Sequence, residues 1–335
     1  MILVCSEGLS ASQIDAIRDV LTRRGLDSDV SESHGRTLVS VRDEPGALED
    51  LSVDRIPGVD SVIRTGSPYP LAALADRERT EVRMGAARVG DGSFTVVAGP
   101  CSVEDRKQLL ETAAAVRSAG GDGLRGGAFK PRTSPYSFRG LEDEGLALLA
   151  EAREVTGLPV VTEVLDTRDV ERVAAVADVL QLGSRNMHNA PLLREAGASG
   201  KAVLLKRGMA STLAEFLLAA ETVLGAGGTD VILCERGIRS FDPGMRNILD
   251  LNAVPALRRM THLPILIDPS HGAGRASLVP SLALAAAAAG ADGLLIEVHP
   301  RPEMSRSDGS QALLPDALAS LVRRCRAVAE IAREE

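Results

Sequence analysis

Short apolar runs alternate with helix-like segments along most of the chain. From about residue 82 onward, eight runs have the length and apolar character of buried strands. They are Phe94–Ala98, Gly123–Arg125, Pro159–Glu163, Val179–Leu182, Ala202–Lys206, Val231–Cys234, Pro264–Asp268 and Gly293–Glu297. Most are followed by segments with helical spacing, at Glu104–Ala119, Gly140–Thr156, Thr167–Ala175, Ala190–Ala196, Ser211–Gly225, Gly274–Ala289 and Leu314–Ile331; the link at Gly244–Arg259 is less regular. Eight such β-α units predict a closed α/β barrel of the (β/α)8 (TIM) type, with an open, doubly wound sheet as the alternative.

The first part of the chain has a different pattern. Met1–Cys5, Thr37–Val41 and Val59–Thr65 are predicted strands, while Ser10–Arg24 and Ala47–Asp54 are predicted helices. Two prolines and then charged residues follow, and Gly90-Asp91-Gly92 predicts a tight hairpin before the barrel. We therefore expect a small α+β domain at 1–70, a linker and hairpin at 71–93, and a catalytic barrel at 94–335.

Composition and charge narrow the class of protein. A hydrophobic fraction of 44% and a charged fraction of 25% are typical of globular proteins, and the net charge of −8 argues against nucleic acid as a main partner. The most apolar run, Leu278–Ala291, is too short to span a membrane, and the N-terminus lacks the pattern of a signal peptide. The four cysteines are widely separated, which is typical of reduced thiols. We expect a cytoplasmic protein with neither nucleic-acid nor membrane partners.

A reactive or charged side chain follows each predicted barrel strand. Active sites of (β/α)8 barrels lie where the strands end and the loops begin. The side chains at these positions are Cys101, Arg125, Glu163, Arg185, Lys206, Arg236, His271 and Glu297. Because all these loops open at one end of a barrel, we expect the side chains to converge on a single cavity.

Cations are concentrated in these loops. Besides those at the strand ends, the same loops contain Lys130, Arg132, Arg207 and Arg239. Guanidinium groups bind phosphate and carboxylate with two parallel hydrogen bonds, and lysine binds them as a point charge. The cavity should therefore hold at least two anionic groups, although any single one of these side chains could instead be solvated surface.

Three of the strand-end groups and Asp308 form a possible metal site. Cys101, His271, Glu297 and Asp308 follow the first, seventh and eighth predicted strands, which are neighbours in a closed barrel. Sulfur, imidazole and carboxylate ligands together suit a divalent first-row ion and do not select one. Taken alone, Cys101 is better interpreted as a buried structural thiol, and for His271 alone a phosphate-binding or general-acid role competes. His299 is a second nearby candidate.

The fragments AGPCSVE, LRGGAFKPRTSPYSFRGL, LLKRG, CERGIR, DPSH and EVHP occur in this order along the chain. With them, the chain resembles the DAHP (3-deoxy-D-arabino-heptulosonate 7-phosphate) synthases of the short microbial type, class Iβ, over about residues 83–332. Residues 1–70 more loosely resemble the small ferredoxin-like regulatory domain of some of these enzymes. The family joins phosphoenolpyruvate to D-erythrose 4-phosphate in the first step of the shikimate pathway.

The resemblance implies a role for each site residue. Cys101, His271, Glu297 and Asp308 match ligands of one divalent ion, for which we expect Mn2+, with Fe2+, Co2+ or Zn2+ as alternatives. The residues that match phosphoenolpyruvate contacts are Arg125, Lys130, Arg185, Lys206 and Arg236; Arg132 and Thr133 match contacts to the phosphate of erythrose 4-phosphate. Lys130, Glu163 and His271 are the expected catalytic groups. The family also implies a homotetramer or a homodimer.

Two other functions remain open at this point. One is that of the sister enzyme, which condenses phosphoenolpyruvate with arabinose 5-phosphate and shares the barrel. That enzyme family typically has an Asn-Arg-Ser-type loop after the second strand, where this chain has Lys130-Pro131-Arg132-Thr133. A non-catalytic binding or regulatory barrel is the second, although the expected ligands and cations are all present. Residues 1–70 are equally open: they can sense an aromatic amino acid, support oligomerisation or be a structural appendage.

Overall fold

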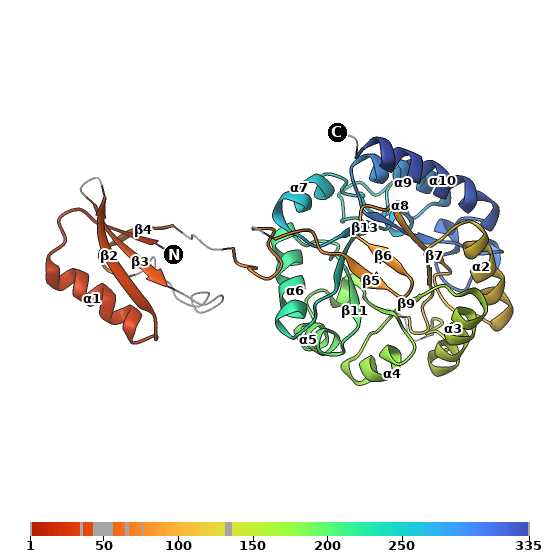
Figure 1. The fold of residues 1–335 in the computed structure, drawn as a ribbon, viewed down its shortest axis with the longest axis horizontal. Helices are drawn as coiled ribbons and strands as arrows, with labels where there is room; N and C mark the ends of the chain where they lie inside the picture. Colours follow the sequence, from red (N-terminus) through yellow and green to blue (C-terminus); the bar gives the residue numbers. More distant parts are fainter. Residues whose placement is uncertain are drawn as a thin grey trace. The chain divides into compact units, whose positions relative to one another are not determined.

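The chain forms two compact units, Met1–Pro70 and Leu71–Glu335, shown in Figure 1. The computed structural model describes residues 2–33, 36–42, 56–63, 67–75, 77–130 and 136–333. Each unit has its own hydrophobic core and is described by itself below.

The first unit is a small antiparallel α+β structure. Its elements are β1 (Ile2–Cys5), α1 (Ala11–Thr22), β2 (Asp27–Ser33), β3 (Arg36–Arg42) and β4 (Val59–Ile63). The sheet has the order β2-β3-β1-β4, and the core residues Ile17 and Leu21 of α1 cluster with Leu3 and Val39 of the sheet. The expected helix at Ala47–Asp54 lies outside the described residues.

Strand β2 was not predicted from the sequence. Its sequence DSDVSES contains one apolar residue, Val30, which is exposed. The strand pairs with β3 along its whole length, from Asp27 opposite Arg42 to Ser33 opposite Arg36. The backbone hydrogen bonds to β3 therefore stabilise β2, a polar edge strand whose own sequence has no apolar pattern.

The second unit contains the predicted closed barrel of eight parallel strands, so this fold prediction is confirmed. The strands are β7 (Thr95–Gly99), β8 (Gly123–Arg125), β9 (Val160–Glu163), β10 (Val179–Leu182), β11 (Ala202–Lys206), β12 (Val231–Glu235), β13 (Ile265–Ile267) and β14 (Gly293–Glu297). The ring closes between β14 and β7, where Glu297 pairs with Gly99. This closure brings the loop after β7 beside the end of β14.

Helices surround the barrel, as Figure 1 shows. They are α2 (Arg106–Ser118), α3 (Glu142–Thr156), α4 (Val170–Ala174), α5 (Ala190–Ala198), α6 (Leu213–Gly225), α7 (Ala253–Met260), α9 (Val279–Ala288) and α10 (Pro315–Ile331). The sequence pattern did not predict the short helix α8 (Pro269–Ala273). Asp268 caps it by accepting a hydrogen bond from the backbone N–H of His271, at 2.9 Å.

Residues 71–93 belong to the second unit and pack on the barrel. The Glu221 carboxylate accepts hydrogen bonds from the backbone N–H groups of Leu71 and Ala72, at 3.0 and 2.8 Å. The first residues of the expected linker are therefore bound to α6, so the structure differs from a free linker there.

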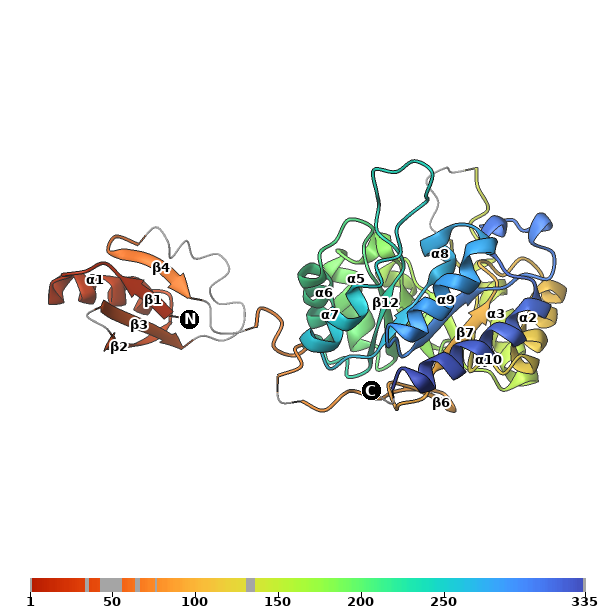
Figure 2. The same cartoon turned by 90° about the horizontal axis from the view of Figure 1, so that it is seen from above.

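The hairpin is formed by β5 (Val82–Met84) and β6 (Ala87–Val89), and it turns at Gly85 rather than at the expected Gly90-Asp91-Gly92. Gly85 has a φ of +56°, which favours glycine. Val82 and Met84 pack against the strands of the barrel core, which places this turn. Figure 2 shows β6 at one end of the barrel, away from the tall loop that follows β12.

Candidate active site

The carboxyl ends of the barrel strands surround a cavity of about 310 Å³. The sequence-predicted residues that line it are Arg125, Lys130, Glu163, Arg185, Lys206, Arg236, Arg239, His271 and Asp308. Arg132 and Thr133 lie outside the described residues. Nine side chains, most of them distant in the sequence, therefore converge on one space, because each lies at or after the end of a strand of the same barrel.

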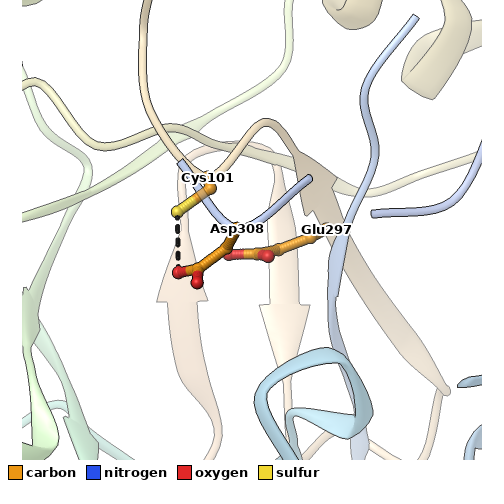
Figure 3. Close-up of side chains that lie close together, drawn as sticks. All are labelled: Cys101, Glu297 and Asp308. Carbon is orange, nitrogen blue, oxygen red and sulfur yellow. Dashed lines mark hydrogen bonds between the residues drawn. The ribbon is translucent and has the colours of Figure 1, made fainter. Parts of the chain in front are cut away.

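A set of possible metal ligands lies at one side of this cavity. One ligand atom each from Cys101, Glu297 and Asp308 lies within 4.8 Å of the other two. Figure 3 shows these three side chains close together. The Nε2 atom of His271 is 3.4 Å from Glu297 Oε1 and 4.0 Å from Asp308 Oδ2. One sulfur, one imidazole nitrogen and two carboxylates therefore converge, and this donor set fits a divalent first-row ion.

The protonation of these ligands follows from their burial and mutual charges. Burial by itself raises the pKa of Glu297, but the charges of His271 and Arg125 lower that pKa below its ordinary value. Burial, and next the charge of Glu297, raise the pKa of the Cys101 thiol to about 11. A bound cation would lower the pKa of the Cys101 thiol again, because it would stabilise the thiolate and screen the charge of Glu297.

Asp268 orients the His271 ring. Its Nδ1 atom lies 2.7 Å from Asp268 Oδ2, so Nδ1 donates the hydrogen bond and the Nε2 lone pair faces Glu297 and Asp308. Burial lowers the pKa of His271, although Asp268 and Glu297 act in the opposite direction. The imidazole is therefore neutral near pH 7, which is the form that binds metals.

Asp268 joins the ligand set to the cations, a role the sequence did not reveal. Its Oδ2 atom accepts hydrogen bonds from both His271 Nδ1 and Lys206 Nζ. Burial raises the pKa of Asp268, but the charges of His271 and Lys206 lower it well below its ordinary value. Its position at the end of β13, in the fragment DPSH, was the only signal in the sequence.

The cations beside the ligand set are mostly buried. Arg125 is 3% exposed and donates from Nη1 to Glu297 Oε1 at 2.6 Å, while its buried Nε has no hydrogen-bond partner within the described part of the chain. Lys130 donates from Nζ to the Cys101 carbonyl at 3.1 Å. A buried, unsatisfied guanidinium donor is costly unless a ligand binds it, so Arg125 is arranged to receive an anion.

Arg236 and two further cavity cations, Arg239 and Arg246, lie on the loop that follows β12. Arg239 was included among the cations of the sequence, whereas Arg246 was missed. Arg246 Nη1 is 3.2 Å from Asp308 Oδ1 and also contacts the Gln311 amide oxygen. Gln311 is fully buried and donates to Glu297 Oε2 at 2.6 Å, so it too belongs to the surroundings of the ligand set.

Arg207, which we expected in the cation cluster, points elsewhere. It is buried, and its Nη1 atom lies 3.0 Å from Glu235 Oε2 and 2.8 Å from Asp250 Oδ2. Glu235 in turn accepts a hydrogen bond from the backbone N–H of Gly237. The Lys206 side chain, at the end of β11, faces the cavity, and the side chain of the next residue points away from the cavity. Arg207 therefore supports the loop that contains Arg236 and does not line the cavity.

Glu163 lies at the end of β9 and is 7% exposed. A Cβ atom on Gly183 would overlap the Glu163 carboxylate, with the Cδ atom at 3.1 Å. The Glu163 carboxylate therefore occupies the space that a side chain at position 183 would need.

Together, the fold and the cavity define a (β/α)8-barrel enzyme that binds anionic substrates beside a site able to hold a metal ion. The chain belongs to the DAHP synthetase I family, whose model matches residues 75–333. None of the helices in the described part of the chain is long and apolar enough to cross a membrane.

Relatives of known identity agree with this assignment. The chain is 44% identical to phospho-2-dehydro-3-deoxyheptonate aldolase of Thermotoga maritima over 98% of both chains. It is 35% identical to 2-dehydro-3-deoxyphosphooctonate aldolase of Bordetella petrii, over 68% of this chain and 89% of that protein.

Solved structures extend the similarity to three dimensions. The crystal structure of the Thermotoga maritima aldolase matches with a TM-score of 0.87 and 43% identity, covering 98% of this chain and 97% of that one. A truncated form of 3-deoxy-D-arabino-heptulosonate 7-phosphate synthase from the same organism matches with a TM-score of 0.74 and 45% identity, covering 79% of this chain and 98% of that one.

Proposed function

We propose that this cavity joins phosphoenolpyruvate to D-erythrose 4-phosphate and releases phosphate, which makes the enzyme a 3-deoxy-7-phosphoheptulonate synthase of the shikimate pathway. The observation that carries the proposal is the convergence of cations from several strand ends beside a Cys/His/Glu/Asp set. The two substrates bring two phosphates and one carboxylate. Guanidinium and ammonium groups bind these anions well, and the family membership of the chain supports the same reaction.

We assign the phosphoenolpyruvate carboxylate and phosphate to five of the cations that line the cavity, which are Arg125, Lys130, Arg185, Lys206 and Arg236. The free Nε of Arg125 supports this, because an anion would satisfy it. Arg132 and Thr133 are proposed, from the family resemblance alone, to bind the phosphate of erythrose 4-phosphate.

Cys101, His271, Glu297 and Asp308 are the residues that would hold one divalent ion, and we propose Mn2+ ahead of Fe2+, Co2+ or Zn2+. Such an ion, when bound, acts as a Lewis acid on the aldehyde carbonyl. His271 is assigned both to this set and to the catalytic groups, because its Nε2 atom faces the same two carboxylates.

Carbon–carbon bond formation is the first chemical step. C3 of phosphoenolpyruvate attacks the aldehyde carbon, and the aldehyde oxygen becomes an alkoxide that takes up a proton. Burial would lower the pKa of Lys130, but the charges of Cys101 and Glu163 raise it above its ordinary value. Its ammonium group is therefore available to protonate the alkoxide or to hold the carboxylate.

Water addition and phosphate release complete the reaction. Water attacks C2 and loses a proton, and phosphate leaves as the bond between C2 and its bridging oxygen breaks. Glu163 lines the cavity with its carboxylate, so it can accept a hydrogen bond from this water and orient it. Positioning by fixed charges supplies much of the rate enhancement in a site of this kind.

The test is consumption of phosphoenolpyruvate, followed as loss of its enol absorbance, with erythrose 4-phosphate and in parallel with arabinose 5-phosphate. We expect consumption with the four-carbon sugar only, lost on adding a chelator and restored by Mn2+. Consumption with the five-carbon sugar alone would identify the sister activity. Absence of consumption with either sugar at saturating metal would favour a binding barrel.

We further propose that residues 1–70 form a regulatory domain that the chemistry does not require, in a cytoplasmic homotetramer or homodimer. All described residues of the cavity belong to the second unit, which supports this separation. Inhibition of the intact chain and of a chain lacking residues 1–70 by Tyr and Phe tests the regulatory role: equal inhibition of both would exclude it. Light scattering with size-exclusion chromatography measures the subunit number.

A further inference from the structure

The segment Ser305–Asp308 connects two short 3-10 turns and carries one of the four possible metal ligands. Asp308 has a φ of +53° and a ψ of 30°, a left-handed conformation that residues with a side chain adopt infrequently. Such a conformation persists only where the surroundings hold it. The contacts of this segment therefore decide where the Asp308 carboxylate lies.

One carboxylate, Glu104, supplies two of these contacts. Its Oε1 atom accepts hydrogen bonds from the backbone N–H of Arg306 at 2.8 Å and from the hydroxyl of Ser305 at 3.1 Å. The Ser305 hydroxyl also lies 2.8 Å from the carbonyl oxygen of Ser307, which is a contact within the segment. The side chain of Glu104 is only 8% exposed, so these donors have no ready substitute in solvent.

Glu104 also lies beside the start of the same loop. Its Oε2 atom is 3.5 Å from Nε2 of His299, a side chain that is 3% exposed, but within the described part of the chain this nitrogen makes no hydrogen bond. Nδ1 of His299 accepts a hydrogen bond from the backbone N–H of Arg301 at 3.0 Å, so the ring proton is on Nε2 and faces Glu104. His299, a second metal candidate from the sequence, thus contacts the loop through Nδ1.

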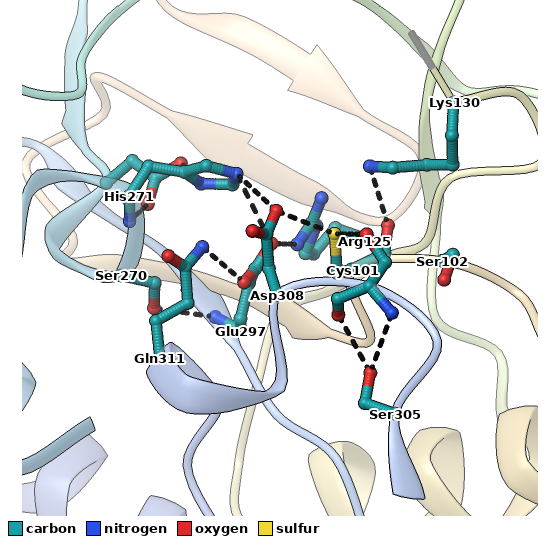
Figure 4. A network of polar contacts seen from close by, with 12 residues as sticks. Cys101, Ser102, Arg125, Lys130, Ser270, His271, Glu297, Ser305, Asp308 and Gln311 are labelled. Atoms are coloured by element: carbon teal, nitrogen blue, oxygen red, sulfur yellow. Dashed lines mark hydrogen bonds and ion pairs between the residues drawn. The ribbon is translucent and has the colours of Figure 1, made fainter. Parts of the chain in front are cut away.

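The other side of the segment contacts the proposed metal ligand Cys101. The Ser307 hydroxyl lies 3.0 Å from the Cys101 sulfur, and Asp308 Oδ2 lies 3.5 Å from it. Figure 4 shows Ser305 and Asp308 in one network with Cys101. Because Glu104 follows Cys101 by three residues, one loop holds the first ligand and, through Glu104, the segment that carries the last.

We propose that Glu104 is a positioning residue whose carboxylate oxygen, by accepting the Arg306 N–H and the Ser305 hydroxyl, places Asp308 against Cys101 and Glu297. This inference rests on the proposed metal site. It predicts that acceptor oxygen at position 104, rather than negative charge, is what the site requires. Glutamine has such an oxygen at the same distance along the side chain, and alanine has none.

The test compares Glu104→Ala, Glu104→Gln and a control, Glu303→Gln, which removes an exposed carboxylate of the same loop. Mn2+ affinity is measured from the electron paramagnetic resonance signal of the free ion. We expect Glu104→Ala to weaken binding by about 10- to 100-fold, as removal of groups that orient metal ligands does. Glu104→Gln and Glu303→Gln are expected to bind Mn2+ nearly as the unaltered protein does.

A second measurement needs neither metal nor substrate. In the metal-free protein, Cys101 is buried under Ser307, so a soluble thiol reagent should react with it slowly. Glu104→Ala should accelerate that reaction, and the acceleration should disappear when Cys101→Ser is added. Should Glu104→Ala not fold, Ser305→Ala, which removes one of the two donors, is expected to shift both readouts in the same direction.

Three results would overturn the inference. They are unchanged Mn2+ affinity and thiol reactivity in Glu104→Ala, equal impairment of Glu104→Gln and Glu104→Ala, and equal impairment of Glu303→Gln. If instead the proposed metal site is wrong, the unaltered protein will not bind Mn2+. The reactivity of Cys101 toward the thiol reagent would still show whether Glu104 holds the segment in place.

Discussion

Replacement of Gly183 by alanine tests the proposed role of Glu163 without touching that residue. Gly183 has a φ of −68° and a ψ of 157°, which any residue adopts readily, so the backbone tolerates the change. The added Cβ atom, however, would overlap the Glu163 carboxylate, whose Cδ atom would be at 3.1 Å and whose Oε1 atom would be nearer still. The carboxylate is the far end of a flexible side chain, so it should move rather than the backbone.

The size of the effect follows from the required displacement. Optimal contact between non-bonded heavy atoms is at about 3.5 Å, so the carboxylate must retreat by on the order of 1 Å. A misplacement of about 1 Å at a reacting centre can cost about 100-fold in rate. Overpacking costs about 1–3 kcal/mol of folding free energy, and the cavity beside Glu163 should keep the cost near the lower end. We therefore expect a much lower kcat and a nearly unchanged melting temperature.

The assay is kcat and KM for both substrates, with the melting temperature from circular dichroism. Gly225→Ala is the matched control, because a Cβ there meets only a Leu71 methyl group, at 4.0 Å. An unchanged kcat in Gly183→Ala would refute the reasoning, because the rate would then not depend on the position of the Glu163 carboxylate. A large fall in melting temperature would also contradict it, because the backbone would have moved instead of the side chain.

Four further changes have definite expected outcomes. Cys101→Ser should abolish metal-dependent turnover and leave the circular dichroism spectrum unchanged; full turnover by this variant, or by chelated unaltered protein, would contradict the metal assignment. Arg207→Met should lower the free energy of unfolding in urea by about 3–5 kcal/mol, because it leaves Glu235, at 0% exposure, without its cation. Arg168→Met, which breaks an exposed ion pair, should lower the free energy of unfolding far less than Arg207→Met; equal costs would refute this. A chain that lacks residues 1–70 should keep its kcat, and a loss of kcat would show that catalysis requires the first unit.

Much of the barrel was predictable because its strands are short apolar runs buried on both faces. Val179–Leu182 and Gly293–Glu297 have the same bounds in the structure as in the prediction. The edge strand Asp27–Ser33 was missed, because pairing with β3 rather than its own side chains holds it. The hairpin turn was misplaced because Gly90 and Gly92 are stronger turn signals than Gly85, whereas packing of Val82 and Met84 decided the position.

The members of the candidate site were likewise predictable as far as strand ends could identify them. The rule that barrel active sites lie at these ends selects Arg125, Glu163 and Lys206 with no knowledge of side-chain directions. The rule does not separate Lys206 from Arg207, which are adjacent but enter different networks. It also does not reach Arg246, which contacts Asp308 across 62 residues of the chain.

The sequence by itself determined the number and order of the barrel strands, the reactive residue after each strand, and the family. These features are local, since each depends on a few neighbouring residues and their periodicity. Only the tertiary structure decided which oxygen of Glu297 faces Arg125, that Asp268 joins Lys206 to His271, and that Glu104 holds the segment of Asp308. These features depend on distances of a few ångströms between distant segments, which closure of the barrel and packing of its loops establish.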